Sequence, residues 1–142
     1  MPGRELQDHR RVEQMDLYYK STRNSNLKVT ASEAILKGLA PDGGLFVPEK
    51  LPVLGKSMEE LKDLNYQDTA YEVMKCFLTD FTEEELRNCI EKAYDSKFDD
   101  EAIAPLVKVE DTYYLELFHG ATIAFKDMAL SLLPYCFLAS LI

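Results

Sequence analysis

Lys126 is the side chain whose type and setting most directly suggest chemistry. It lies between Phe125 and the apolar residues 128–130, near the start of a predicted helix. Desolvation and the positive end of a helix dipole both disfavour an ammonium ion, so we expect a lowered pKa for Lys126. A neutral amine can attack an aldehyde and form a Schiff base. In the alternative interpretation, more common for lysines in general, the stem packs on apolar surface and the charged head reaches water.

Four neighbours of Lys126 are weaker candidates for a functional role. The hydroxyl of Thr122 could contact a substrate or stabilise a turn. His119 could line a pocket, or it could be a hydrogen-bonded structural histidine. Asp127 could cap the helix, influence Lys126 electrostatically or face solvent. Gly120 would supply backbone freedom that a side chain would block.

The elements that position these residues begin at Pro105. The runs 106–109 and 113–118 are rich in β-branched and aromatic residues, so they predict a hairpin that turns at 110–112. The second strand leads into a glycine turn, and a helix is predicted to begin near Ala124. The succession of strand, glycine turn and helix start is where α/β proteins place ligand-binding groups.

The first half of the chain predicts short strands and a capped helix. Residues 17–29 hold two short apolar clusters around a polar stretch, which predicts a small hairpin. Thr30 and Glu33 have the spacing of a capping box, and Gly38 suits the end of that helix. Residues 40–48 predict a rigid turn that leads to an extended apolar segment.

Three further helices are predicted between residues 57 and 94. The capping pattern recurs at Ser57 with Glu60, before a short helix to residue 64, and at Thr82 with Glu85. Between them, residues 66–78 predict a longer helix. The apolar faces of the last two helices contain Ala70, Val73, Met74, Phe77 and Leu78, and then Leu86, Cys89, Ile90, Ala93 and Tyr94. We expect these helices to serve packing and to carry no chemistry.

Composition restricts the possible partners. The 142 residues include 16 Lys and Arg against 25 Asp and Glu, a net charge of -9. This balance argues against nucleic acid and anionic membranes as partners, because both are bound by clustered basic residues. Three widely spaced cysteines and two histidines do not have the spacing of a metal site, so we expect no metal and reduced thiols in a cytoplasmic protein. Residues 1–14 are polar throughout, so we interpret them as a leader or tag-like segment before a second plausible start at Met15.

The segment FHGATIAFKDMAL, residues 118–130, closely resembles the cofactor-lysine segment of threonine synthases. In that family a Phe-His-Gly-(Pro or Ala)-Thr stretch leads into Ala-Phe-Lys-Asp. Residues 18–23 (YYKSTR) and 34–48 (AILKGLAPDGGLFVP) resemble the opening segments of the family, in the same order and at similar spacing. The resemblance extends from Met15 to about Pro134.

This resemblance implies a fold, a reaction and a cofactor. It implies an α/β protein with a small N-terminal helix-and-strand domain at 15–104 and, at 105–142, the beginning of a fold-type II pyridoxal-phosphate (PLP) domain. Threonine synthases are lyases that convert O-phosphohomoserine and water into threonine and phosphate, using PLP as an electron sink. Lys126 would hold PLP and then move protons between the cofactor and the α and β carbons of the substrate, while His119 and Thr122 would contact the substrate.

The sequence also departs from the family. No glycine-rich cradle for the cofactor phosphate follows Lys126, and the tail after Pro134 does not resemble the family's helix. We therefore expect a truncated chain that is inactive alone. Residues 128–142 carry no charge and are too short for a membrane helix, so we expect them to mediate self-association.

Two alternative functions stay open. The first is another fold-type II PLP lyase, such as a serine/threonine dehydratase or a relative of the tryptophan synthase β chain; the opening segments argue against it. The second is a non-catalytic fragment that self-associates or binds a partner chain.

Overall fold

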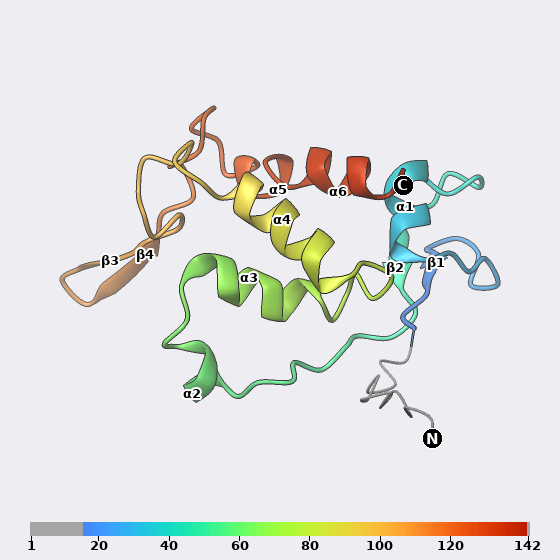
Figure 1. The fold of residues 1–142 in the computed structure, drawn as a ribbon, viewed down its shortest axis with the longest axis horizontal. Coiled ribbons are helices and arrows are strands. Elements are labelled where there is room, and N and C mark those ends of the chain that lie inside the picture. The colour runs from blue at the N-terminus through green and yellow to red at the C-terminus, as the bar shows by residue number, and fades with distance from the viewer. Residues whose placement is uncertain (1–15, 142) are drawn as a thin grey trace, which may run out of the picture.

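The N-terminal end of the structure is a two-stranded sheet against one helix. The computed structural model describes residues 16–141, so the segment 1–14 lies outside the described residues. Strand β1 (Tyr19–Ser21) pairs antiparallel with β2 (Phe46–Pro48), and α1 (Ala31–Lys37) lies between them in the sequence. This group lies at one end of the molecule in Figure 1.

The prediction of a hairpin within residues 17–29 is wrong about which strands pair. Tyr19 and Val29 form only one bridge, with N–H to carbonyl distances of 2.8 and 3.0 Å, and the strand partner of β1 is β2. The physical reason is a long-range contact: the hydroxyl of Ser21, which is 2% exposed, donates to Asp42 Oδ1 at 2.7 Å. Because the buried Ser21 hydroxyl takes Asp42 as its hydrogen-bond partner, the 42–48 segment lies alongside β1.

The predicted capped helices are confirmed. Reciprocal capping boxes open α1, α2 (Met58–Leu61) and α4 (Glu83–Ala93). At α4, Glu85 N–H donates to the Thr82 hydroxyl at 3.2 Å, and Thr82 N–H donates back to the Glu85 carboxylate at 2.8 Å. Helix α3 (Tyr66–Met74) ends four residues earlier than predicted.

The core lies between α3 and α4 and extends under the C-terminal helices. Leu86 and Ile90 of α4 are each 1% exposed, and all five residues of the predicted α4 stripe are buried. Helix α5 (Asp127–Leu130) and helix α6 (Leu133–Ala139) follow one another above the oblique α4 in Figure 1, and α6 contacts both α4 and α1. The buried core cluster comprises Tyr71, Leu86, Ile90, Ala93, Tyr94, Phe98 and Ile103.

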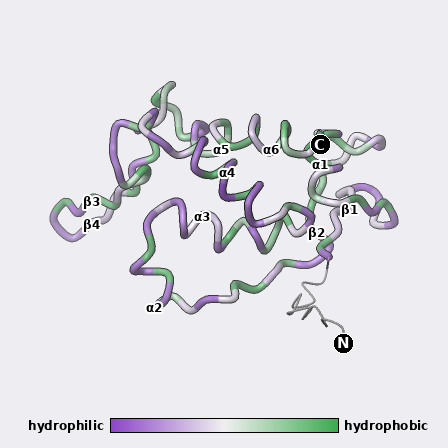
Figure 2. Tube along the Cα trace, viewed as in Figure 1, coloured by the Kyte–Doolittle hydropathy of each residue, from purple (hydrophilic) through white to green (hydrophobic). Residues whose placement is uncertain are grey.

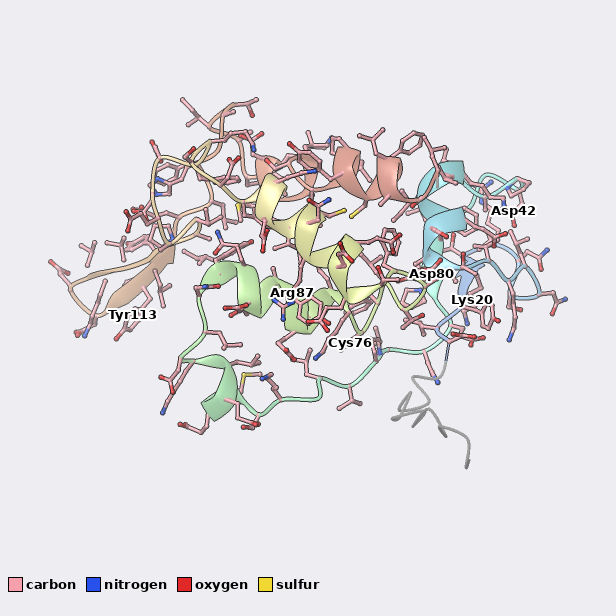
Figure 3. All side chains as sticks on the ribbon, in the orientation of Figure 1. Lys20, Asp42, Cys76, Asp80, Arg87 and Tyr113 are labelled. Atoms are coloured by element: carbon pink, nitrogen blue, oxygen red, sulfur yellow. The ribbon has the colours of Figure 1, made fainter. Side chains whose placement is uncertain are left out.

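The hairpin predicted after Pro105 is confirmed and projects from the rest of the molecule (Figures 1 and 3). Strand β3 (Leu106–Val109) pairs with β4 (Thr112–Leu115), which is shorter than the predicted 113–118 strand. Every residue of both strands is exposed, including apolar side chains on the two faces of the ribbon. Leu115 and Val107, one on each face, are 58% and 38% exposed.

The C-terminal helices also expose apolar side chains. Figure 2 shows hydrophobic residues along α5 and α6. The exposed ones are Leu130, Leu133, Phe137, Leu138 and Leu141. None of the helices in residues 16–141 is both long and apolar enough to cross a membrane.

Candidate functional site

The turn between β4 and α5 begins with a histidine held by two carboxylates. His119 Nε2 lies 2.8 Å from Glu116 Oε2, and Nδ1 lies 2.5 Å from Asp99 Oδ1. These two acidic partners raise the pKa of His119 above its ordinary value of 6.5. Both ring nitrogens are therefore engaged within the chain, and this geometry favours the structural interpretation of His119 over a role in binding substrate.

A third carboxylate, that of Asp127, closes the same turn from the other side. The hydroxyl of Thr122 donates to Asp127 Oδ1 at 2.6 Å, and the N–H of Thr122 donates to Oδ2 at 2.7 Å. Asp127 is only 5% exposed, so it does not face solvent. These two donors hold the pKa of Asp127 below its usual value. We call this pair of residues the Thr122–Asp127 clasp.

Gly120 is required by close packing against the clasp. A Cβ atom added to Gly120 would lie 2.6 Å from Asp127 Cβ and 2.7 Å from Oδ2, closer than real Cβ atoms approach. Ile123, inside the loop that the clasp closes, has φ of 63°. That conformation is unfavourable for a β-branched residue, so the surrounding contacts must hold it in place.

Lys126 lies at the entry to α5, beside an apolar hollow of about 480 Å³. The hollow is lined by Tyr66, Ala104, Leu115, Leu117, Phe125, Lys126, Met128 and Ala129. The Lys126 side chain is nevertheless exposed, and α5 has only four residues. The prediction that Lys126 is desolvated is therefore wrong for the chain as the structure describes it, residues 16–141. The hollow beside Lys126 is open to solvent on one side.

The two opening segments, residues 18–23 and 34–48, contact each other but lie away from Lys126. Asp42 accepts hydrogen bonds from the hydroxyl of Ser21 and, at 2.9 Å, from the N–H of Gly44. A Cβ at Gly44 would lie 2.1 Å from Ser21 Oγ, so this turn requires glycine there. Asp42 is labelled in Figure 3 at the β1–β2 end, whereas the turn before α5 lies at the opposite end of α5 and α6 (Figure 1).

Within residues 16–141, the cysteines and acidic residues form no second candidate centre. Cys76, Cys89 and Cys136 are free thiols, and burial raises the pKa of Cys136 to about 12. That shift keeps the thiol protonated and unreactive. Within the described part of the chain, no group of three or more potential ligands could hold a metal ion.

Comparisons with known proteins all point to threonine synthases. The family profile described as threonine synthase N terminus matches residues 18–94. The threonine synthase of Eremothecium gossypii is 43% identical over 126 residues, which cover 82% of this chain and 24% of the relative. That of Methylobacillus glycogenes is 37% identical over 129 residues, covering 84% of this chain and 27% of the relative.

Solved structures agree with these relatives. The PLP-bound threonine synthase from Brucella melitensis has a TM-score of 0.78 and 33% identity, covering 88% of this chain and 27% of that one. Yeast threonine synthase has a TM-score of 0.77 and 35% identity, covering 84% and 25% of the two chains. The chain thus spans about a quarter of the length of the proteins it matches.

Proposed function

The chain belongs to the threonine synthase family, and we propose that Lys126 is the residue through which it binds PLP. As part of a complete enzyme, it would take part in converting O-phosphohomoserine and water into threonine and phosphate. The observation that carries this proposal is the position of Lys126, in a turn between a strand and a helix and at the rim of an apolar hollow. Relatives named threonine synthase, one of them solved with PLP bound, support it.

The described residues fit one part of the cofactor. The amine of Lys126 and the apolar walls of the hollow suit an aldehyde-bearing aromatic ring. When bound, PLP would withdraw electrons from the substrate carbon atoms. Lys126 Nζ would hold the cofactor, and later accept and return protons beside it. Residues 127–141 offer no glycine-rich loop for the cofactor phosphate, so we propose that this chain alone is inactive.

The division into a domain at 15–104 and the beginning of a cofactor domain at 105–142 remains a proposal. It is supported by the change from helices to the β3–β4 hairpin after Pro105. The two parts are in contact, since the Tyr94 hydroxyl of the first donates to the Met128 carbonyl of the second at 2.7 Å. We further propose a cytoplasmic protein that acts on a small molecule, with no nucleic-acid or membrane partner, in keeping with a net charge of -9.

The exposed apolar side chains favour a second role for this chain by itself, namely self-association. Leu138 and Leu141 are 59% and 61% exposed on an uncharged segment. Such a surface loses contact with water when it meets another apolar surface. Sedimentation velocity over a range of concentrations would detect this association, and a single monomeric species at every concentration would contradict it.

Trapping of the cofactor tests the assignment of Lys126. The purified chain would be mixed with PLP and reduced with borohydride, and the label on each lysine would be quantified by mass spectrometry. Lys108 is the matched control, because it is exposed in the β3–β4 hairpin and does not line the hollow. We expect several-fold more label on Lys126 than on Lys108, and loss of that excess in Lys126→Ala. Label shared equally among exposed lysines would refute the assignment. Release of phosphate from O-phosphohomoserine should stay at background.

A further inference from the structure

The Thr122–Asp127 clasp is built differently from a helix cap. A capping side chain accepts hydrogen bonds from the first N–H groups of its own helix. Asp127 is the first residue of α5, but both of its oxygen atoms accept hydrogen bonds from Thr122, five residues earlier. The carboxylate therefore ties the start of the helix back to the turn that precedes it.

The clasp encloses the backbone that leads to Lys126. Ile123 N–H donates to the carbonyl of Gly120, just before the clasp, at 3.0 Å, and inside the clasp Asp127 N–H donates to the Ala124 carbonyl at 3.0 Å. On the helix side, the Lys126 carbonyl accepts from Leu130 N–H at 2.9 Å. Hydrogen bonds on both sides of Lys126 thus hold the main chain around it.

An unfavourable backbone conformation in the same loop indicates that the clasp restrains the main chain. Ile123 has a φ of 63°, a backbone conformation that a β-branched residue keeps only where other contacts impose it. The contacts that span Ile123 are those of Thr122 with Asp127. Without them, the loop would relax toward ordinary backbone angles and carry Lys126 with it.

We propose that Asp127 is a positioning residue for Lys126: through Thr122 it holds the turn so that the lysine amine meets the apolar hollow. This inference rests on the proposed function, because positioning the amine matters only if Lys126 reacts with PLP. The dense packing agrees with it, since Gly120 leaves no room for a Cβ beside Asp127. Strained backbone held by a buried polar group is common at ligand sites.

Two substitutions at Thr122 separate positioning from charge. Thr122→Val removes the hydroxyl hydrogen bond and leaves the charge of Asp127 beside Lys126 unchanged. Thr122→Ser keeps the hydroxyl. In the borohydride assay we expect the several-fold excess of label on Lys126 over Lys108 to be lost in Thr122→Val and in Asp127→Asn, so that the two lysines are labelled equally. Thr122→Ser should stay within about twofold of the unmodified chain.

A stability control excludes a general loss of structure. Ile90→Val destabilises the core away from the turn, and urea unfolding would show whether it is weakened as much as Thr122→Val. Where the unmodified chain shows the preference for Lys126, the positioning role is refuted if Thr122→Val leaves the label ratio unchanged, or if Ile90→Val lowers it as much as Thr122→Val.

Competitive acetylation with acetic anhydride keeps the two proposals distinguishable, because it reports the reactivity of each lysine without PLP. The inference expects the pH profile of Lys126 acetylation, relative to Lys108, to change in Thr122→Val and to be restored in Thr122→Ser. If that happens while PLP shows no preference for Lys126, Asp127 positions the amine and the proposed cofactor role is wrong. An unchanged profile in Thr122→Val overturns the positioning role, whatever PLP does.

Discussion

Shortening Ile90 to alanine tests whether the α3–α4 core holds this chain together. Ile90 is 1% exposed and belongs to the buried cluster centred on α4. The substitution removes three buried carbon atoms, which at about 0.8 kcal/mol each gives about 2.4 kcal/mol of lost transfer free energy. The cavity left behind adds to this, so we expect unfolding to become easier by about 2–5 kcal/mol. That is a large fraction of the stability of an ordinary domain.

Urea unfolding followed by far-ultraviolet circular dichroism measures this change in the free energy of unfolding. Val53→Ala is the matched control, because Val53 is 89% exposed and its substitution should change stability by at most about 0.5 kcal/mol. A loss of less than about 1 kcal/mol in Ile90→Ala, or a loss equal to that of Val53→Ala, would refute the reasoning. The chain would then be held together by contacts other than this core.

Two further predictions concern charge and association. The bonds from Glu116 and Asp99 raise the pKa of His119 above 6.5, so its protonated form adds stability that is fully present below about pH 6.5 and is lost as pH rises through the raised pKa. The difference in unfolding free energy between the unmodified chain and His119→Gln should therefore shrink from about pH 6 to about pH 9; a constant difference would contradict it. Leu138→Glu should weaken self-association in sedimentation, whereas Leu51→Glu, at an 83% exposed site outside α6, should not; equal effects would contradict the assignment of the surface.

Helix starts could be predicted from the sequence because capping depends on neighbours within one turn. Thr82 and Glu85 satisfy each other's backbone N–H groups, and no distant residue is needed. The end of α3 could not be predicted in this way. The chain turns after Met74, and the Phe77 carbonyl accepts the hydroxyl of Tyr19 at 3.0 Å. That partner lies 58 positions away, so the apolar periodicity of residues 66–78 does not reveal it.

The sequence predicted which residues belong to the candidate site, but it did not predict which of them contact one another. The segment around Lys126 was recognisable as a motif, whereas the partner of His119 across the turn, Asp99, lies 20 positions earlier in a loop. The pairing of Thr122 with Asp127 had a weak local signal, an acidic residue at a helix start five residues after a threonine. Helix capping was the more common interpretation of that signal, because only the folded turn shows which way the carboxylate points.

Lys126 is exposed for the same reason as the apolar side chains beside it: they line one hollow that is open to solvent. Phe125 and Leu115 are 73% and 58% exposed, and both line the hollow beside Lys126. A protein surface that covers these two side chains would also close the hollow, and the amine would then lose its contact with water. Desolvation disfavours the ammonium form and so favours the neutral amine that reacts with an aldehyde. Covering Phe125 and Leu115 would therefore add to the reactivity that we propose for Lys126 in the chain alone, and the Thr122–Asp127 clasp would hold the backbone beside it.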